Sequence, residues 1–131
     1  MQRATTAWNW FADSGMLNSS HLVNDGLTGS CTNNGQTVWT YNQGLAIGGA
    51  LELWRATGDT SRLSTARQLG DAAMSSLSPG GILTESCDPA GTCDDNQKQF
   101  KGIFMRYLTD LADATGEAPY RTYAQHQAES I

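Results

Sequence analysis

The sequence of 131 residues has few charged side chains, and the basic ones are the rarer kind. Lys and Arg number 8 against 13 Asp and Glu, which gives a formal net charge of -5 at pH 7. Because no basic cluster could follow a phosphate backbone, we expect neither nucleic acid nor a membrane surface as a partner. No apolar run is long enough to span a bilayer, and the first residues lack the apolar core of a signal peptide. We therefore expect any export signal to lie upstream of Met1.

Metal ligands and thiols are equally scarce. The 2 histidines and 3 cysteines do not have the spacing of a zinc site, so we expect neither a metal ion nor a cofactor. Cys87 and Cys93 flank a turn-rich loop that could bring their Cα atoms within disulfide range, with two free thiols as the alternative. If they pair, Cys31 is left over, and it is then either free and buried or bonded to a partner outside this chain.

What the sequence does contain is helical periodicity. Apolar side chains recur mostly at helical spacing and predict a helix from about Tyr41 to Thr57, ended by a left-handed cap at Gly58. A cleaner stripe begins at Phe100 and runs to the next such glycine, Gly116. Its members are Phe100, Ile103, Phe104, Tyr107, Leu108, Leu111 and Ala112.

The two predicted helices belong to an internal repeat. Ala56-Thr57-Gly58-Asp59 recurs 58 positions later as Ala114-Thr115-Gly116-Glu117, and a second helical stretch follows each turn. Trp8 and Phe11 indicate one further helix near the start. Repeated helical hairpins are typical of an open solenoid or of a closed ring with inner and outer helices. We therefore predict an all-α fold of about five helices, forming an incomplete ring in one unit that comprises residues 1–131.

Two long polar connections, residues 17–38 and 78–96, separate the predicted helices. Long loops in a compact unit are usually functional, and both lead into the start of a predicted inner helix. We expect both loops at the same end of the ring. The last stretch, Tyr123 to Ile131, has no helix stop signal, which indicates a chain cut within a helix. A small natural domain with a frayed last helix is the alternative.

The first connection ends in the motif Trp39-Thr40-Tyr41-Asn42-Gln43-Gly44. Aromatic faces pack on the C–H side of a pyranose ring, and carboxamides offer paired donors and acceptors to vicinal hydroxyls. The motif therefore favours a sugar-binding site. The alternative is a structural role, with Trp39 in the core and Asn42 as the helix cap.

Two further motifs, Gly81-Ile82-Leu83-Thr84-Glu85 and the stretch from Asp95 through Phe100-Lys101-Gly102 to Leu108, complete a pattern. It resembles glycoside hydrolase family 76, which includes bacterial endo-α-1,6-mannanases and fungal cell-wall transglycosidases, over essentially the whole chain. The resemblance implies an (α/α)6 barrel, of which this chain would supply the later middle part. It also implies a retaining mechanism with an adjacent Asp pair on an earlier inner helix as nucleophile and general acid/base. No segment of this chain matches that helix.

Several other polar residues are candidates for the site. Asp25 resembles a family position close to the cleft, and a turn-forming role explains it equally well. Phe100 and Lys101 correspond by the repeat to Asn42 and Gln43, so we expect them at the same rim. Asp94-Asp95 offers the two carboxylates that a glycosidase needs, but its position in a loop favours helix capping and solvation. Glu85 could face the cleft, and the simpler interpretation is a solvated or salt-bridged carboxylate.

The sequence thus predicts part of a secreted glycoside hydrolase that cleaves α-1,6-mannan, inactive by itself because its catalytic Asp pair lies upstream. We expect its partners to be a mannan-type polysaccharide and the rest of its own barrel. The competing hypothesis is a non-catalytic α-solenoid that binds glycan or protein along its concave surface. The predicted sugar-binding residues are Asp25, Trp39, Tyr41, Asn42, Gln43, Phe100 and Lys101.

Overall fold

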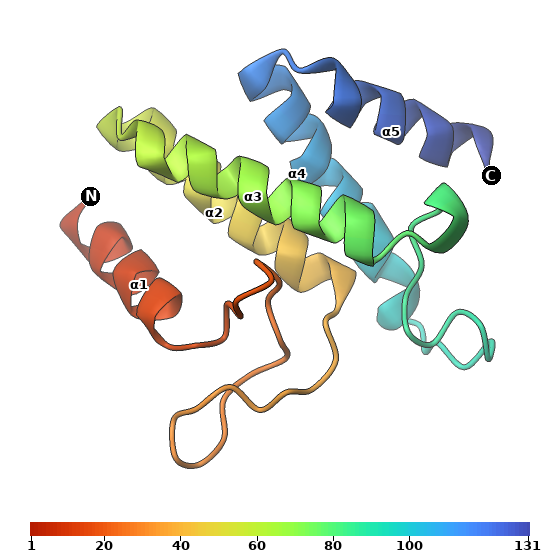
Figure 1. Ribbon diagram of the computed structural model, residues 1–131, viewed down its shortest axis with the longest axis horizontal. Coiled ribbons are helices and arrows are strands. Elements are labelled where there is room, and N and C mark those ends of the chain that lie inside the picture. The colour runs from red at the N-terminus through yellow and green to blue at the C-terminus, as the bar shows by residue number, and fades with distance from the viewer.

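The computed structural model describes residues 1–131, and all of its regular elements are helices (Figure 1). The expectation of an all-α fold with about five helices is confirmed. Short 3-10 turns lie at Pro79–Gly81 and Gln97–Gln99. The α-helices are α1 (Gln2–Asp13), α2 (Thr40–Thr57), α3 (Thr60–Ser76), α4 (Phe100–Thr115) and α5 (Ala118–Glu129).

The internal repeat is a structural repeat, in which α2–α3 and α4–α5 turn in the same way. Gly58 and Gly116 end the first helix of each hairpin in the left-handed conformation, with φ of 72° and 70°. Each donates its N–H to the carbonyl four residues earlier, at 2.8 Å in both turns. The hydroxyls of Thr57 and Thr115 donate to carbonyls of the preceding turn, at 2.6 and 2.9 Å. Glycine is favoured at such caps because an L side chain is strained at positive φ.

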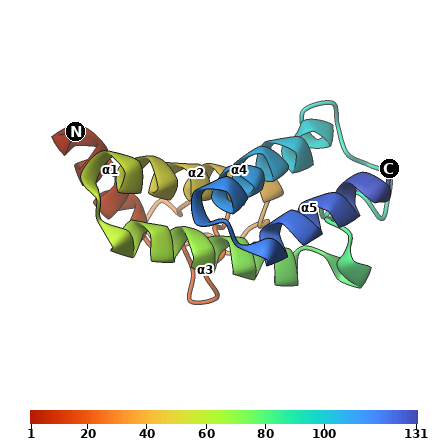
Figure 2. The same ribbon diagram turned by 90° about the horizontal axis from the view of Figure 1, so that it is seen from above.

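The two hairpins pack as a small two-layer stack. Figure 2 shows α2 and α4 together in one layer, with α3 and α5 in the other. Helices α2 and α4 approach closely because Gly44 and Gly48 face α4: a Cβ added at Gly44 would lie 2.8 Å from Cα of Phe104. A Cβ at Gly48 would lie 2.4 Å from the ring of Tyr107. This arrangement is that of a partial α/α barrel, with α2 and α4 as inner helices and α3 and α5 as outer ones.

The core lies between these layers. Its fully buried apolar side chains come from both hairpins and include Ile47, Leu51, Leu69, Phe104, Leu108 and Leu111. Burying one such side chain stabilises the fold by roughly 1.5–3 kcal/mol, so this shared core holds the two hairpins together. Helix α1 stands apart from this core and joins it mainly through Trp8, whose ring lies 5.9 Å from the guanidinium of Arg62.

The first long loop is built from two successive tight turns. Isolated β-bridges join Leu17 to Val23 and Leu27 to Asn33, and each turn contains one residue at positive φ, His21 at 57° and Cys31 at 58°. Cys31 is exposed at the tip of a surface turn, so the alternative of a free and buried thiol is wrong, and a partner outside this chain stays a prediction. In the second loop Cys87 and Cys93 form a disulfide with a Cα–Cα distance of 5.0 Å, as the turn-rich spacing favoured.

Candidate functional site

Three aromatic side chains meet where α2 and α4 begin, at the end of the stack where both long loops arrive (Figure 1). The ring of Phe100 lies 5.5 Å from that of Trp39 and 4.3 Å from that of Tyr41, measured between centroids. All three side chains are partly exposed. We call Trp39, Tyr41 and Phe100 the aromatic rim. The repeat therefore places the starts of both inner helices side by side, as expected.

Gln43 lies beneath this rim rather than on it. Its side chain is completely buried, and its amide oxygen accepts the N–H of Val23 at 2.7 Å. Its amide nitrogen donates to the carbonyls of Val23 and Trp39, both at 2.9 Å. Every polar group of the carboxamide is thus used within the protein, and Gln43 fixes the first loop to α2 instead of presenting hydrogen bonds to a ligand.

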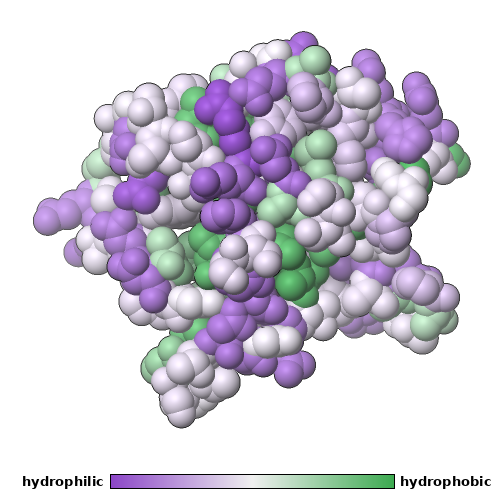
Figure 3. Space-filling model, in the orientation of Figure 1, coloured by the Kyte–Doolittle hydropathy of each residue, from purple (hydrophilic) through white to green (hydrophobic).

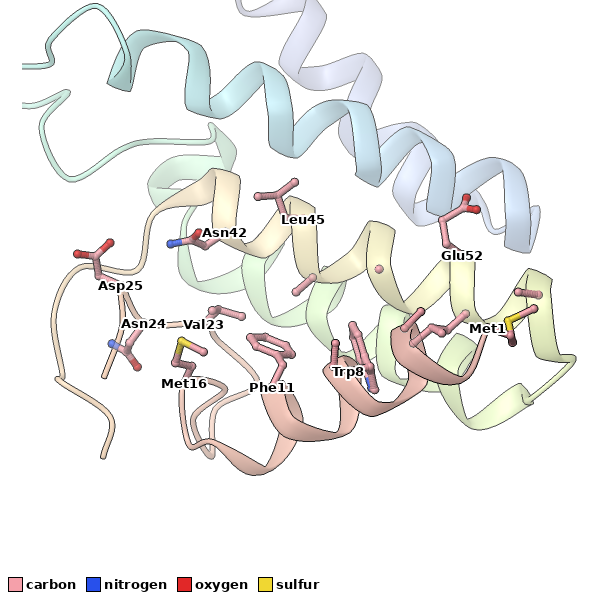
Figure 4. Close-up of a pocket in the computed structure, with 16 residues that line it drawn as sticks. Met1, Trp8, Phe11, Met16, Val23, Asn24, Asp25, Asn42, Leu45 and Glu52 are labelled. Carbon is pink, nitrogen blue, oxygen red and sulfur yellow. The ribbon is translucent and has the colours of Figure 1, made fainter. Parts of the chain in front are cut away.

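Asn42 and Asp25 line one end of an open groove of about 680 Å³ between α1 and α2 (Figure 4). The groove is mostly apolar, and Phe11, Met16 and Leu45 contribute to its walls. Leu45 is 49% exposed there, although it belongs to an inner helix. Figure 3 shows hydrophobic atoms gathered near the centre of one face of the molecule, with hydrophilic atoms around them. The groove is therefore an apolar surface that the described chain leaves uncovered.

The loop that carries Asp25 is held by its neighbour Asn24. The buried Asn24 side chain accepts hydrogen bonds from the amides of Asn18 and Asn33, each at 2.9 Å. It also donates to the carbonyl of Gln36 at 2.7 Å. Asp25 itself is exposed, and its carboxylate has no hydrogen-bond or ion-pair partner within the chain. A fixed loop thus presents a free carboxylate at the end of the groove.

Glu85 was the residue that sequence reasoning judged least accurately. The interpretation as a solvated or salt-bridged group is wrong, because only 2% of Glu85 is exposed and it forms no ion pair. Its Oε1 accepts the backbone N–H of Thr40 at 3.2 Å and the Thr40 hydroxyl, while Oε2 has no partner. Burial is the largest effect and raises the pKa of Glu85 above its ordinary range, against the lowering effect of the Thr40 hydrogen bonds.

Helix α2 has no cap of its own, and Glu85 supplies it. The residue before the helix is Trp39, whose side chain has no hydrogen-bond acceptor for the first turn, and Asn42 lies inside the helix. The alternative that Asn42 caps the helix is therefore wrong. The absence of Ser, Thr, Asp or Asn before Thr40 was the one signal that a distant acceptor was needed.

Lys101 and Asp88 form an ion pair beside Glu85. The ammonium of Lys101 lies 2.6 Å from Oδ2 of Asp88, and the same oxygen accepts the N–H of Glu85 at 2.7 Å. Although burial raises the pKa of Asp88, hydrogen bonds from Lys101 and from the Glu85 backbone outweigh it and leave the pKa below its ordinary range. Asp88 follows Cys87 directly, so the disulfide loop carries the carboxylate that orients Lys101.

The adjacent pair Asp94-Asp95 has local structural roles. Asp94 accepts the N–H groups of Asn96 and Gln97, each at 2.9 Å, in the turn that leads into α4. Asp95 pairs with Lys98 at 2.9 Å on the surface, three residues along the chain. Neither aspartate caps α4, whose N-cap position is Gln99, whereas Asp95 is solvated as expected. Elsewhere, no three His, Cys, Asp or Glu side chains are grouped as a metal site, and no helix has the length and apolarity to cross a membrane.

Repeated helical hairpins whose inner helices begin side by side define a member of the α/α-barrel class. The comparison with known families is more specific. Glycosyl hydrolase family 76 matches residues 1–131, and the chain belongs to this family.

Its relatives include the mannan endo-1,6-alpha-mannosidase DFG5 of Saccharomyces cerevisiae, 33% identical over 114 residues. That match covers 82% of this chain and 25% of the relative. DFG5 of Candida albicans is 30% identical over 122 residues, covering 86% of this chain and 27% of the relative. The chain thus spans about a quarter of the length of the curated relatives it matches. No solved structure matches it at a significant level.

Proposed function

We propose that this chain is part of a secreted glycosidase that cleaves α-1,6-mannan, and that it forms one wall of the sugar-binding cleft. The observation that supports this most directly is the meeting of Trp39, Tyr41 and Phe100 from two inner helices at one rim. Family membership supports the glycosidase class, and the activity for which the relatives are named supports the α-1,6-mannan linkage.

The proposed wall has an apolar and a polar part. Partly exposed aromatic rings offer faces to the C–H side of a pyranose, while Asp25, Asn42 and Lys101 offer acceptors and donors to its hydroxyls. Gln43, which was predicted to contact sugar, takes a different role in this proposal. Because its amide is saturated inside the protein, it sets the position of Trp39 through the carbonyl that it bonds.

We assign the bond cleavage itself to residues outside this segment. A retaining glycosidase needs one carboxylate as nucleophile and a second as general acid/base, about 5 Å apart across the glycosidic bond. In this chain Asp94 accepts local backbone N–H groups and Asp95 forms a surface ion pair, so the proposal places the catalytic Asp pair on another inner helix. By itself the segment should bind sugar weakly and should not cleave it.

The rest of the barrel is the proposed occupant of the open groove. Helix α1 lies beside α2 with the open groove between them (Figure 4), and we assign this groove to an inner helix from outside the segment. The quarter-length coverage of the relatives is consistent with additional hairpins. Secretion is supported by the disulfide, which persists in oxidising compartments.

The test compares two tryptophans in the longest natural reading frame that contains these residues. Trp39→Ala should raise the KM for α-1,6-mannan by on the order of 10-fold or more, because a stacking face is lost. Trp10→Ala, on an α1 residue that is 60% exposed and away from the rim, should leave KM unchanged. Mannan with a different linkage serves as the substrate control.

Two outcomes would contradict the proposal. Equal effects of Trp39→Ala and Trp10→Ala would remove the aromatic rim from the sugar site. Binding of mannan without cleavage by the complete protein would favour the competing function, a non-catalytic helical module that holds glycan.

A further inference from the structure

The second loop reaches the sugar rim through one buried side chain. Glu85 is separated from Thr40 by 45 positions, yet its Oε1 accepts both the backbone N–H and the hydroxyl of that residue. Thr40 is completely buried and is the first residue of α2, between Trp39 and Tyr41. The contact therefore fixes the helix turn from which two of the three rim aromatics project.

We propose that Glu85 is a positioning residue of the sugar site, which sets Trp39 and Tyr41 by accepting hydrogen bonds from Thr40 and takes no part in the chemistry. The inference rests on the proposed function for its link to sugar binding. Glu85 cannot touch substrate in this structure, because its side chain is buried and Oε2 meets no solvent.

The geometry indicates that acceptance of hydrogen bonds, rather than negative charge, is what the site requires. One oxygen receives two donors and the other none, which is an arrangement that a neutral carboxyl group or a carboxamide can reproduce. The charged groups that face Glu85 are Asp88 on its own loop and Lys101 on α4, and these two already neutralise each other. No cation is therefore left to balance an ionised Glu85.

The main experiment measures KM and kcat for α-1,6-mannan in the complete protein, with substitutions at Glu85 and at Thr40. Glu85→Leu removes the acceptor of both Thr40 hydrogen bonds and should raise KM by about 10-fold, with kcat changed less than about twofold. Glu85→Gln keeps an oxygen acceptor and should restore KM. Glu52→Gln, a change at an exposed carboxylate, is the matched control.

Thr40→Val covers the case in which Glu85→Leu fails to fold. It keeps the shape of the buried side chain and removes only the hydroxyl donor, so KM should rise by a few-fold, and Thr40→Ser should restore it. A kcat loss of 100-fold or more in Glu85→Gln, on the order of what a lost catalytic group costs, would show a catalytic carboxylate and overturn the proposal. Unchanged KM in Thr40→Val and Glu85→Leu would also overturn it.

A readout without sugar separates this inference from the proposed function. Fluorine NMR of protein labelled with fluorotryptophan reports the environment of Trp39, with Trp39→Phe identifying its signal. Thr40→Val should shift that signal while the signal of Trp10 stays in place. If the signal shifts but the wild-type protein does not bind mannan, the proposed function fails and the positioning contact stands. If it does not shift, the positioning contact itself is refuted.

The pH dependence of stability tests whether charge matters. Because burial raises the pKa of Glu85, the folded chain keeps this proton to higher pH than the unfolded chain does. Its contribution to stability is fully present at low pH and is lost as pH rises through the raised pKa. Glu85→Gln has no proton to lose, so its stability relative to the wild type should increase with pH in this range. The opposite slope would show that Glu85 acts as an ion.

Discussion

Both long loops are held to the helices by buried contacts, but the two loops use different kinds of contact. Each is held by a buried glutamine from a helix: Gln43 bonds the backbone of Val23 in the first loop, and Gln127 bonds Leu83 and Gly81 in the second. Beyond that, the first loop relies on neutral amides around Asn24, whereas the second adds a disulfide, an ion pair and a buried carboxyl group.

The difference indicates which conditions each loop should resist. Neutral hydrogen bonds are insensitive to redox state, salt and pH, so the position of Asp25 should not depend on them. The second loop orients Lys101 and caps α2 through groups that respond to all three. If the chain forms a sugar wall, its aromatic rim is therefore the part that solution conditions can disturb.

The largest effect on stability is expected from removing Gln43, the buried glutamine of α2 that holds the first loop. Gln43→Ala leaves three backbone groups without partners inside the protein and opens a cavity, so it should lower the free energy of unfolding by roughly 2–4 kcal/mol. Gln127→Ala, which removes two bonds, should cost less. Gln125→Ala, at an exposed position on the same helix, should cost almost nothing. Urea unfolding measures all three, and equal values for Gln43→Ala and Gln125→Ala would contradict the buried role.

Opening the disulfide should have a smaller effect, confined to the second loop. Replacing Cys87 and Cys93 by Ser frees a loop of seven residues, for which the chain-entropy relation gives about 2 kcal/mol. Since Asp88 lies within that loop, the affinity for mannan should fall as well. Cys31→Ser, at the exposed free cysteine, is the control and should change neither quantity. A double Ser variant with wild-type stability and affinity would refute the structural role of the bridge.

The smallest effect is expected for the ion pair of the second loop. Lys101→Met should lower the stability by about 1 kcal/mol or less, because both side chains are about one-third exposed and water screens their attraction. The difference should shrink when salt is added. Lys98→Met, which breaks a more exposed pair, should be silent at any salt concentration. A loss at Lys101 that is independent of salt would show a packing role for its aliphatic stem instead.

The sequence predicted the parts of the fold that depend on local pattern. The helical stripe of α4, the glycine caps at Gly58 and Gly116 and the repeat are all confirmed, because periodicity and turn chemistry act over a few residues. The pairing of Cys87 and Cys93 also depends on local sequence, because only six positions separate the two residues.

The site was harder to predict because its decisive contacts span long separations. Gln43 has the side chain of a sugar-binding residue, and only its 20-position contact with Val23 reveals that the amide is already saturated. Glutamate is usually a surface residue, yet Glu85 is buried against Thr40. Nothing in a local window distinguishes a free carboxamide or carboxylate from one that a distant loop will cover.

Because Glu85 and Thr40 are separated by 45 positions, their contact should form late in folding. The first turn of α2 lacks a local cap, so it should fray until residues 78–96 have folded back onto it. Closing such a separation is slower than forming either helix, which places completion of the rim after the hairpins have packed. The surface proposed to meet sugar would then be the last part of this segment to acquire its final shape, and amide hydrogen exchange should find Thr40, whose N–H Glu85 accepts, less protected than Leu51 at the centre of the same helix.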